Sequence, residues 1–358
     1  MKKTIIFISF ILIIFPFFSC ERRENPQSSN SRTIHDMEYS EVIEIIPVND
    51  EADFQVTLNA NGDGVVIVRY IGRSNVVHIP AIIQGIPVIE IGEAAFSRDS
   101  STLSRIDVDI NYIIIPSGIT KIGRYAFANQ SIRSLVLPDT IKILEAGAFS
   151  NCKELTSVSL PAAPDNIGDS SGGTGVFSGC SALEKIIIPE GYLYIGYAMF
   201  SGTGLKEIII PSSIEDIGHY AFSYSSLSSI IFNGNNLKNI WNEAFAGCDF
   251  TTFEIPEGVE RIGEKAFEYN RDLITLTFPS TIRQIGMSAF KDCIALTTVN
   301  IPDSARSINF LQGYNLSRDL RDASPAFYGV DNLSLASQAA LRRVGYTQVF
   351  GTPALILE

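Results

Sequence analysis

The residues best suited to metal or redox chemistry are the cysteines, and four of the five share one spacing. Each of the four stands three residues after a phenylalanine; they are Cys152, Cys180, Cys248 and Cys293. Thr203, Ser225 and Asn270 stand at the same distance from other phenylalanines. Zinc sites need clustered Cys and His residues, which this spacing does not provide. We therefore expect no metal here, and reduced, buried side chains that satisfy backbone groups at a turn.

The three histidines do not form a catalytic set. His35, His78 and His219 lie in different parts of the chain, and no local motif of a nucleophilic serine or cysteine accompanies them. Gly172-Gly-Thr-Gly175 lacks the lysine of a phosphate-binding loop. The sequence therefore predicts no catalytic residue and no cofactor.

Several carboxylates directly follow a proline: Asp139, Glu190, Glu257 and Asp303. Calcium prefers six to eight oxygen ligands, which single, evenly spaced carboxylates do not supply. We interpret these residues as a solvated row along one edge, with a calcium site as the lesser alternative.

The phenylalanines before these turns recur with a fixed period. They are Phe96, Phe127, Phe149, Phe177, Phe200, Phe222, Phe245, Phe267, Phe290 and Phe327, and from Phe177 to Phe290 the spacing alternates between 23 and 22 residues. A regular period of this length predicts a solenoid, in which stacked units share one continuous core.

Each unit begins with an alternating apolar segment such as Leu183/Ile186/Ile188, which predicts a short strand. A proline then ends the segment, where its missing N–H no longer interrupts a ladder. An Ile-Gly step follows, with too few residues before the next strand for more than a turn or a 3₁₀ piece. Glu145 and Trp241 replace the glycine of this step in two units.

The period predicts a solenoid that is rich in β-structure, with one short parallel strand per 22–23-residue unit; the resemblance to a known repeat class, carried by the pattern from Leu205 to Phe222, implies that it is a leucine-rich-repeat solenoid. Residues 54–58 and 65–70 flank Asn61-Gly-Asp-Gly64 and predict an N-terminal β-hairpin cap. Residues 333–344 have helical spacing of apolar positions and predict a C-terminal helical cap. The expected divisions are a signal peptide (1–19), a lipidated N-terminus and tether (20–50), the N-terminal cap (51–90), the repeats (91–330) and the C-terminal cap (331–358).

The unit resembles the BspA-like (surface-protein-A-like) class of leucine-rich repeats. The residues that carry the resemblance have the pattern Leu-x-x-Ile-x-Ile-Pro…Ile-Gly-x-x-Ala-Phe, seen without interruption from Leu205 to Phe222. The resemblance covers roughly residues 75 to 330. It implies a surface-exposed protein of host-associated bacteria that adheres to host matrix proteins, host cells or other bacteria.

The N-terminus predicts export. Lys2 and Lys3 precede an apolar run from Ile5 to Phe18, which is typical of a signal peptide. Ser19-Cys20 resembles the lipobox of bacterial lipoproteins, in which the cysteine is acylated. Phe17 stands where most lipoboxes have leucine, so an ordinary signal peptide is the alternative. With lipidation, Cys20 would anchor the protein to the bacterial outer membrane or cell surface.

The charge excludes nucleic acid as a partner. Removal of residues 1–19 takes away two lysines and no acidic residue, which leaves 25 basic and 39 acidic residues and a formal charge of −14. Binding to phosphates requires clustered lysine and arginine instead.

The position between the last two buried residues of each strand should face outward. It holds, in order, Ile114, Val136, Ser159, Ile187, Ile209, Ile231, Glu254, Thr277 and Asn300. An almost continuous apolar stripe from Ile114 to Ile231, with charged residues beside it, has the composition of an interaction surface. The alternative explanation is β-propensity alone. We expect a protein or glycan ligand, host matrix proteins included; a structural envelope lipoprotein is the second alternative, and an enzyme the third.

Overall fold

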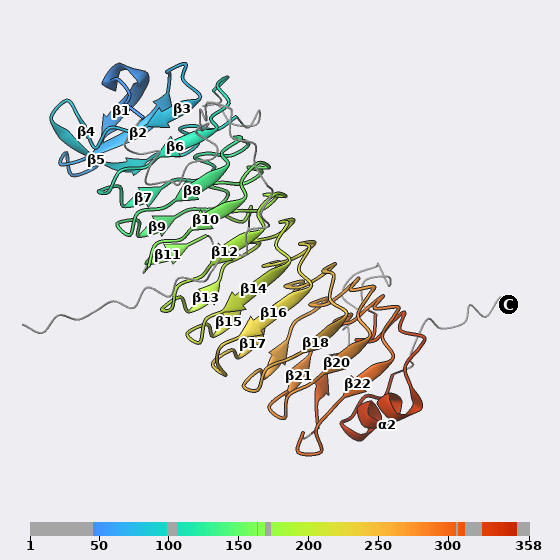
Figure 1. The fold of residues 1–358 in the computed structure, drawn as a ribbon. Helices are drawn as coiled ribbons and strands as arrows, with labels where there is room; N and C mark the ends of the chain where they lie inside the picture. The colour runs from blue at the N-terminus through green and yellow to red at the C-terminus, as the bar shows by residue number, and fades with distance from the viewer. Residues whose placement is uncertain are drawn as a thin grey trace, which may run out of the picture. The chain divides into compact units, whose positions relative to one another are not determined.

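In the computed structural model each 22–23-residue unit is one coil of a solenoid, and the coils stack in register (Figure 1). The structure describes residues 46–98, 106–162, 164–168, 173–305, 307–311 and 324–348. The signal peptide, Cys20, residues 21–45 of the expected tether and most of the insertions at 97–109, 169–175 and 309–324 lie outside these residues. Residues 46–50, which were also expected to belong to the tether, lie within them. The predicted solenoid with parallel strands is confirmed.

One side of each coil contributes a strand of three or four residues, and we refer to this side as the long-strand face. Its strands are β3 (Val76–His78), β6 (Tyr112–Ile114), β8 (Ser134–Val136), β10 (Ser157–Ser159), β12 (Lys185–Ile187), β14 (Glu207–Ile210), β16 (Ser229–Phe232), β18 (Thr252–Glu254), β20 (Thr275–Thr277) and β22 (Thr298–Asn300). Every pairing between them is parallel. Proline follows each of these strands within two residues and ends it, except after β16, where Asn233 takes this position.

A second parallel ladder runs along the return half of each coil, where we expected only a turn or a 3₁₀ piece. Its strands are β5 (Ile86–Ile91), β7 (Lys121–Ile122), β9 (Ile143–Leu144), β11 (Asn166–Ile167), β13 (Tyr194–Ile195), β15 (Asp216–Ile217), β17 (Asn239–Ile240), β19 (Arg261–Ile262), β21 (Gln284–Ile285) and β23 (Asn309–Phe310). Two residues are enough because coil stacking, rather than local propensity, places each strand beside the next.

The repeat phenylalanines form a column inside the third side of the coils. Neighbouring rings from Phe96 to Phe327 are stacked, with centroids 4.9 to 6.1 Å apart. Tyr70 stacks on the first ring at 5.5 Å, and Tyr346 packs edge-on against the last at 5.3 Å. The column therefore joins the core across all the coils.

The N-terminal elements form the expected hairpin. The 3₁₀ helix η2 (Glu51–Asp53) leads into β1 (Phe54–Leu58), which pairs antiparallel with β2 (Val65–Tyr70). β2 then pairs parallel with β5, and β4 (Ile82–Ile83) pairs antiparallel with β5. The hairpin thus continues the ladder of short strands.

The expected C-terminal helix is α2 (Leu335–Arg343), with Ser334 as N-cap. Its first turn lies against β22: the Ser334 N–H donates to Thr297 O at 2.9 Å, and Ser337 Oγ accepts from the Val299 N–H at 2.9 Å. The helix therefore satisfies backbone groups at the edge of the long-strand face. Among the described residues, no helix is both long and apolar enough to cross a bilayer.

Candidate functional site

Three isoleucines form an exposed stripe in the middle of the long-strand face, and we call them the isoleucine stripe. Ile187, Ile209 and Ile231 have 79%, 54% and 54% of their surface exposed. Ile209 and Ile231 are in register on neighbouring strands. The adjacent Ile208 and Ile210 are buried, because successive side chains of a strand alternate between its faces. The predicted outward orientation is confirmed for these three residues.

A hollow of about 710 Å³ lies along the stripe. Pro189 and Pro211, which end β12 and β14, extend its apolar wall. Charged residues complete the lining: Glu184, Lys185, Glu190 and Glu207. The sequence analysis missed the prolines as part of this surface, although their fixed place after each strand was the available signal. An apolar hollow with a charged rim is suited to receive apolar groups of a partner.

The stripe is shorter than predicted, because the prediction is wrong at its N-terminal end. Ile114 is only 4% exposed. Ile114 is in register with His78 of β3. The ring Nδ1 of His78 lies 3.0 Å from Ile46 O, and its backbone N–H donates to Asn49 Oδ1 at 2.8 Å. Residues 46–49 therefore lie at this end of the face, and Ile46 is itself buried.

Val136 is half-buried, and the exposed Ser159 separates it from Ile187. On the other side of the stripe, the outward position of β18 is held by the exposed Glu254. The apolar surface is therefore confined to three neighbouring strands, β12, β14 and β16.

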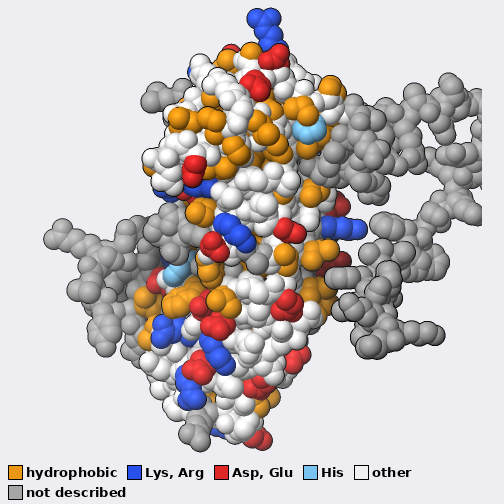
Figure 2. Space-filling view, turned by 90° about the vertical axis from the view of Figure 1, so that its left-hand side faces the viewer, with side chains coloured by type: hydrophobic (Ala, Val, Ile, Leu, Met, Phe, Trp, Pro, Cys, Tyr) orange, Lys and Arg blue, Asp and Glu red, His pale blue; other side chains and the backbone are white. Residues whose placement is uncertain are grey.

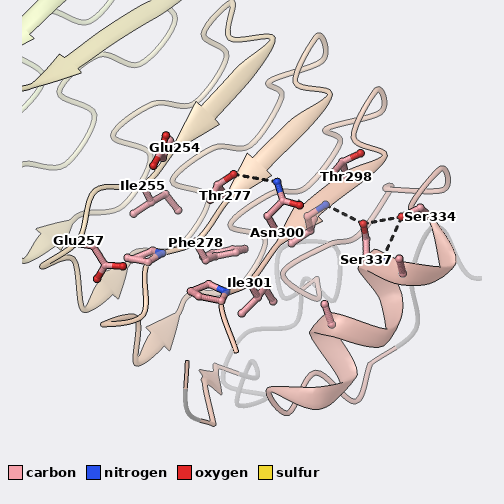
Figure 3. Close-up of a pocket in the computed structure, with 15 residues that line it drawn as sticks. Glu254, Ile255, Glu257, Thr277, Phe278, Thr298, Asn300, Ile301, Ser334 and Ser337 are labelled. Atoms are coloured by element: carbon pink, nitrogen blue, oxygen red, sulfur yellow. Dashed lines mark hydrogen bonds between the residues drawn. The ribbon is translucent and has the colours of Figure 1, made fainter. Parts of the chain in front are cut away.

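A second hollow, of about 600 Å³, lies at the C-terminal end of the same face, where α2 meets β22 (Figure 3). Asn300 and Thr277, which hold the outward positions there, bond to each other at 3.2 Å. Ser334 and Ser337 of α2 supply further polar groups. At the outward strand positions of this hollow, polar side chains thus stand where the isoleucine stripe has isoleucine. The hollow lies where α2 packs against the last long strand.

The carboxylates that follow the prolines are exposed, as a solvated row requires, and they also bond to residues further along the chain. Glu190 accepts from the Ser212 N–H at 3.0 Å and from its hydroxyl at 3.2 Å, and Glu257 accepts from Ser280 at 2.9 and 3.0 Å. The backbone hydrogen bond from Ser212, with smaller contributions from the neighbouring hydroxyls, lowers the pKa of Glu190. The other two contacts are Asp139 with the Ala162 N–H at 2.9 Å and Asp303 with Arg343 at 3.7 Å. Across the described ranges, no group of three or more His, Cys, Asp or Glu residues could hold a metal ion.

The cysteine slot faces the backbone of the preceding coil. Cys293 Sγ donates to Phe267 O at 3.2 Å, and Asn270 Nδ2 donates to Phe245 O at 2.8 Å from the same slot. Cys152, Cys180 and Cys248 make the same bond at 3.1 to 3.3 Å. All four thiols are buried, as predicted, and burial raises the pKa of Cys248 to about 12.

The two described histidines are held apart by the fold. His78 lies at the N-terminal end of the long-strand face, whereas His219 packs on Trp241 with ring centroids 5.5 Å apart. In the part of the chain that the structure describes, neither imidazole bonds to a nucleophilic side chain. At the isoleucine stripe, the described geometry offers an apolar surface with charged residues at its rim.

The fold is shared with bacterial proteins of known structure. A leucine rich cell surface protein from Faecalibacterium prausnitzii A2-165 is 23% identical, with a TM-score of 0.50; the match covers 87% of this chain and 97% of that chain. The pneumococcal vaccine antigen PcpA is 20% identical, with a TM-score of 0.51, and 71% of each chain is covered. No curated protein sequence matches the chain.

The family comparison covers most of the coils. The BspA type leucine rich repeat region matches in six copies, over residues 91–227, 170–273 and 199–312. These ranges contain the isoleucine stripe and the phenylalanine column from Phe96 to Phe290. The chain therefore belongs to the BspA-type leucine-rich repeat family.

Proposed function

We propose that this chain is an exported protein of the bacterial cell surface, held there by an acylated Cys20, and that its isoleucine stripe binds a protein ligand. The observation that carries this proposal is the exposure of Ile187, Ile209 and Ile231 in one hollow of the long-strand face. A host matrix protein is the ligand class to test first, because the family resemblance implies adhesion of that kind.

The repeat itself does not require isoleucine at these positions. The equivalent residues of β18, β20 and β22 are Glu254, Thr277 and Asn300, and these strands pair in the same parallel register. β-Propensity alone therefore does not explain three consecutive isoleucines, since threonine suits a strand as well. Exposed aliphatic groups gathered in one hollow are better accounted for by a partner that covers them.

The similar structures support a place at the cell surface. One is named as a cell surface protein and the other as a vaccine antigen. The signal-like N-terminus and Ser19-Cys20 of this chain are consistent with export and anchoring. A purely structural role in the envelope is the alternative that the experiment below separates from ligand binding.

The test is a triple variant, Ile187→Thr, Ile209→Thr and Ile231→Thr. Each substitution should remove about 1 kcal/mol of binding free energy, because less apolar surface is buried against the ligand. The three together should weaken binding roughly 100-fold. Binding of the mature protein to immobilised collagen, laminin and fibronectin is measured by surface plasmon resonance. The matched control replaces Ile274 and Ile294, which are 48% and 51% exposed outside the stripe, by threonine.

Both variants should keep the wild-type circular dichroism spectrum and melting temperature. A folded triple variant that binds like wild type places the ligand elsewhere on the solenoid. If the wild-type protein binds none of the three matrix proteins, the structural envelope role is favoured instead.

A further inference from the structure

The turn around each repeat phenylalanine has a left-handed backbone two residues before the ring, two residues after it, or at both positions. In several coils glycine or asparagine fills these positions: Asn129, Gly147, Asn151, Gly179, Gly202, Gly247 and Gly329. Tyrosine is used instead in the Phe222 coil at both positions, with Tyr220 (φ +59°) and Tyr224 (φ +54°), and in the Phe267 coil after the ring, with Tyr269 (φ +63°). A bulky residue in this conformation costs on the order of 1–2 kcal/mol relative to glycine. Other side chains, such as Ala198, Glu243 and Ser288, adopt the same conformation at equivalent positions. The turn therefore tolerates many residue types, and backbone conformation does not explain the use of tyrosine.

Tyr224 is the most exposed member of this group, with 62% of its surface exposed. Its ring lies against Gly247 of the next coil, where an added Cβ would come 2.6 Å from Tyr224 Cδ1 and 2.7 Å from Cε1. A side chain at position 247 would therefore displace the ring. The Tyr224 ring therefore packs on Gly247 of the next coil with one face and exposes the other face to solvent.

The surroundings of Tyr224 are aromatic and acidic. Tyr197 and Tyr220 lie with ring centroids 5.3 Å apart, and the Tyr220 hydroxyl donates a hydrogen bond to the Glu243 carboxylate. Glu243 is half-buried, and burial raises its pKa. Tyr269 lies on the other side of Tyr224, near enough to influence its ionisation. We call these five residues, Tyr197, Tyr220, Tyr224, Glu243 and Tyr269, the tyrosine patch.

The composition of the tyrosine patch indicates which chemistry it can recognise. It has no aliphatic member, so it lacks the wide apolar surface of the isoleucine stripe. Aromatic rings offer an apolar face, and the hydroxyls and carboxylate beside them offer hydrogen-bond donors and acceptors. A sugar ring presents the complementary groups: C–H bonds on its faces and hydroxyls around its edge.

The charges around the tyrosine patch narrow the ligand further. Glu243 and Glu268 are offset by Lys265 beside them and by Lys291, which pairs with Glu268 at 2.8 Å. The tyrosine patch therefore has no excess of positive charge for binding sulfated, sialylated or phosphorylated saccharides, and the whole chain has a formal charge of −12. Cations are already present on the chain itself: Lys291 Nζ and Arg271 Cζ lie 5.7 and 5.8 Å from the centre of the Tyr269 ring. A cationic partner would compete with them.

We propose that the tyrosine patch is a second binding site, which takes a neutral hexose polysaccharide by placing a sugar ring on Tyr224 and sugar hydroxyls on Glu243. This site is independent of the isoleucine stripe and of the ligand proposed for it.

The test uses the substitution Tyr224→Asn, because asparagine already occupies the equivalent left-handed position at residues 129 and 151. The matched control is Tyr125→Asn, which also replaces a tyrosine with positive φ (+53°) but lies in a distant coil. Migration of the wild-type and variant proteins is compared by affinity electrophoresis through gels that contain a β-glucan, a galactomannan or starch. Thermal melting of each variant is measured in parallel.

We expect at least one of the three polysaccharides to retard the wild-type protein and the Tyr125→Asn variant. Tyr224→Asn should reduce the apparent affinity at least tenfold without lowering the melting temperature. The proposal fails if none of the three retards the wild-type protein, or if Tyr224→Asn is retarded as strongly. Binding of an oligolysine peptide in place of the polysaccharides, with loss in Tyr224→Asn, would identify a cation site and also overturn it.

Discussion

At the scale of single residues, a polar side chain in the slot three residues after the repeat phenylalanine bonds to a backbone carbonyl in several coils. Where the slot holds cysteine or asparagine, its side chain donates to the phenylalanine carbonyl of the preceding coil. The donor is a thiol in Cys293 and an amide in Asn270. A buried carbonyl left without a donor costs about 1–3 kcal/mol. Cysteine therefore has a structural reason to be present that requires neither metal nor disulfide.

The first prediction is that the four slot thiols are reduced and unreactive in the native protein. Burial raises the pKa of Cys248 from 9.0 to about 12, so this thiol stays protonated at pH 8. All four thiols are buried, which keeps a reagent from reaching them. In a chain carrying Cys20→Ala, a thiol reagent at pH 8 should count no thiols before denaturation and four afterwards, without reductant. Two or fewer after denaturation would show a disulfide.

The same pKa shift sets a dependence of stability on pH. A thiol whose pKa is raised by folding contributes stability fully below its unfolded-state pKa near 9 and loses it as the pH rises through about 12. The free energy of unfolding should therefore fall as the pH increases above 9. Urea titrations at pH 8 and pH 10.5, with Cys248→Ser as comparison, measure this; an equal change in both proteins would assign it to other groups.

At the scale of elements, the Ile-Gly step shows why the coils approach each other so closely. A Cβ on Gly218 would lie 2.7 Å from Ile195 O of the previous coil. Trp241 and Glu145 replace the glycine of this step in two coils. The backbone N–H of each still donates to a carbonyl of the previous coil, Ile217 O and Ile122 O respectively. Trp241 Nε1 reaches Asp216 Oδ1 at 3.3 Å, which attaches its side chain to the outer surface of the short strands.

The second prediction is that Gly218→Ala destabilises the solenoid by about 1–3 kcal/mol, because the added methyl group forces two coils apart. Trp241→Ala and Glu145→Ala, at sites that already accommodate a Cβ, should cost less. Denaturant unfolding followed by circular dichroism gives the three values. Equal losses in all three would show that side-chain contacts, and not coil spacing, dominate this step.

The third prediction concerns α2 as a cap for the long-strand face. Ser337 Oγ is bonded to the Val299 N–H, so Ser337→Ala leaves a buried donor without a partner and should cost about 1–3 kcal/mol. Leu335→Ala, in the same helix at a side chain that is 84% exposed, is the control and should change stability little. Thermal melting compares them; an unchanged Ser337→Ala variant would mean that the helix does not protect this edge.

At the scale of the whole molecule, one core runs through every coil, from Tyr70 through the phenylalanine column to Tyr346. The surface around it carries charges of both signs, interspersed on the side shown in Figure 2. The net charge of −12 makes the protein repel anionic lipids. Attachment to a membrane would therefore have to come from an acyl chain.

The fourth prediction follows from this charge. Cys20→Ala should move the protein from the detergent phase to the aqueous phase in detergent partitioning of cells that express it. Export should continue, because the apolar run from Ile5 to Phe18 is unchanged. Retention of the Cys20→Ala variant in the detergent phase would refute lipid anchoring. The control is Ser29→Ala in the tether, which should stay in the detergent phase.

Much of the fold was determined by the sequence itself. The period of the phenylalanines predicted the solenoid, the prolines predicted the ends of the long strands, and the shared slot predicted the buried cysteines. These features repeat in every coil, so a local pattern is enough to specify them.

Tertiary structure decided what depends on contacts between separate segments. Ile114 has the same strand pattern as Ile209. Residues 46–49, however, bond to His78 on the strand next to Ile114, and the repeat pattern does not predict this contact because residues 46–49 lie outside the repeats. The second ladder arises because stacking aligns two-residue segments that are too short to read as strands. Tyr224 and Gly247 come together only because a residue of one coil lies over the next, and this is why the tyrosine patch is visible in the structure alone.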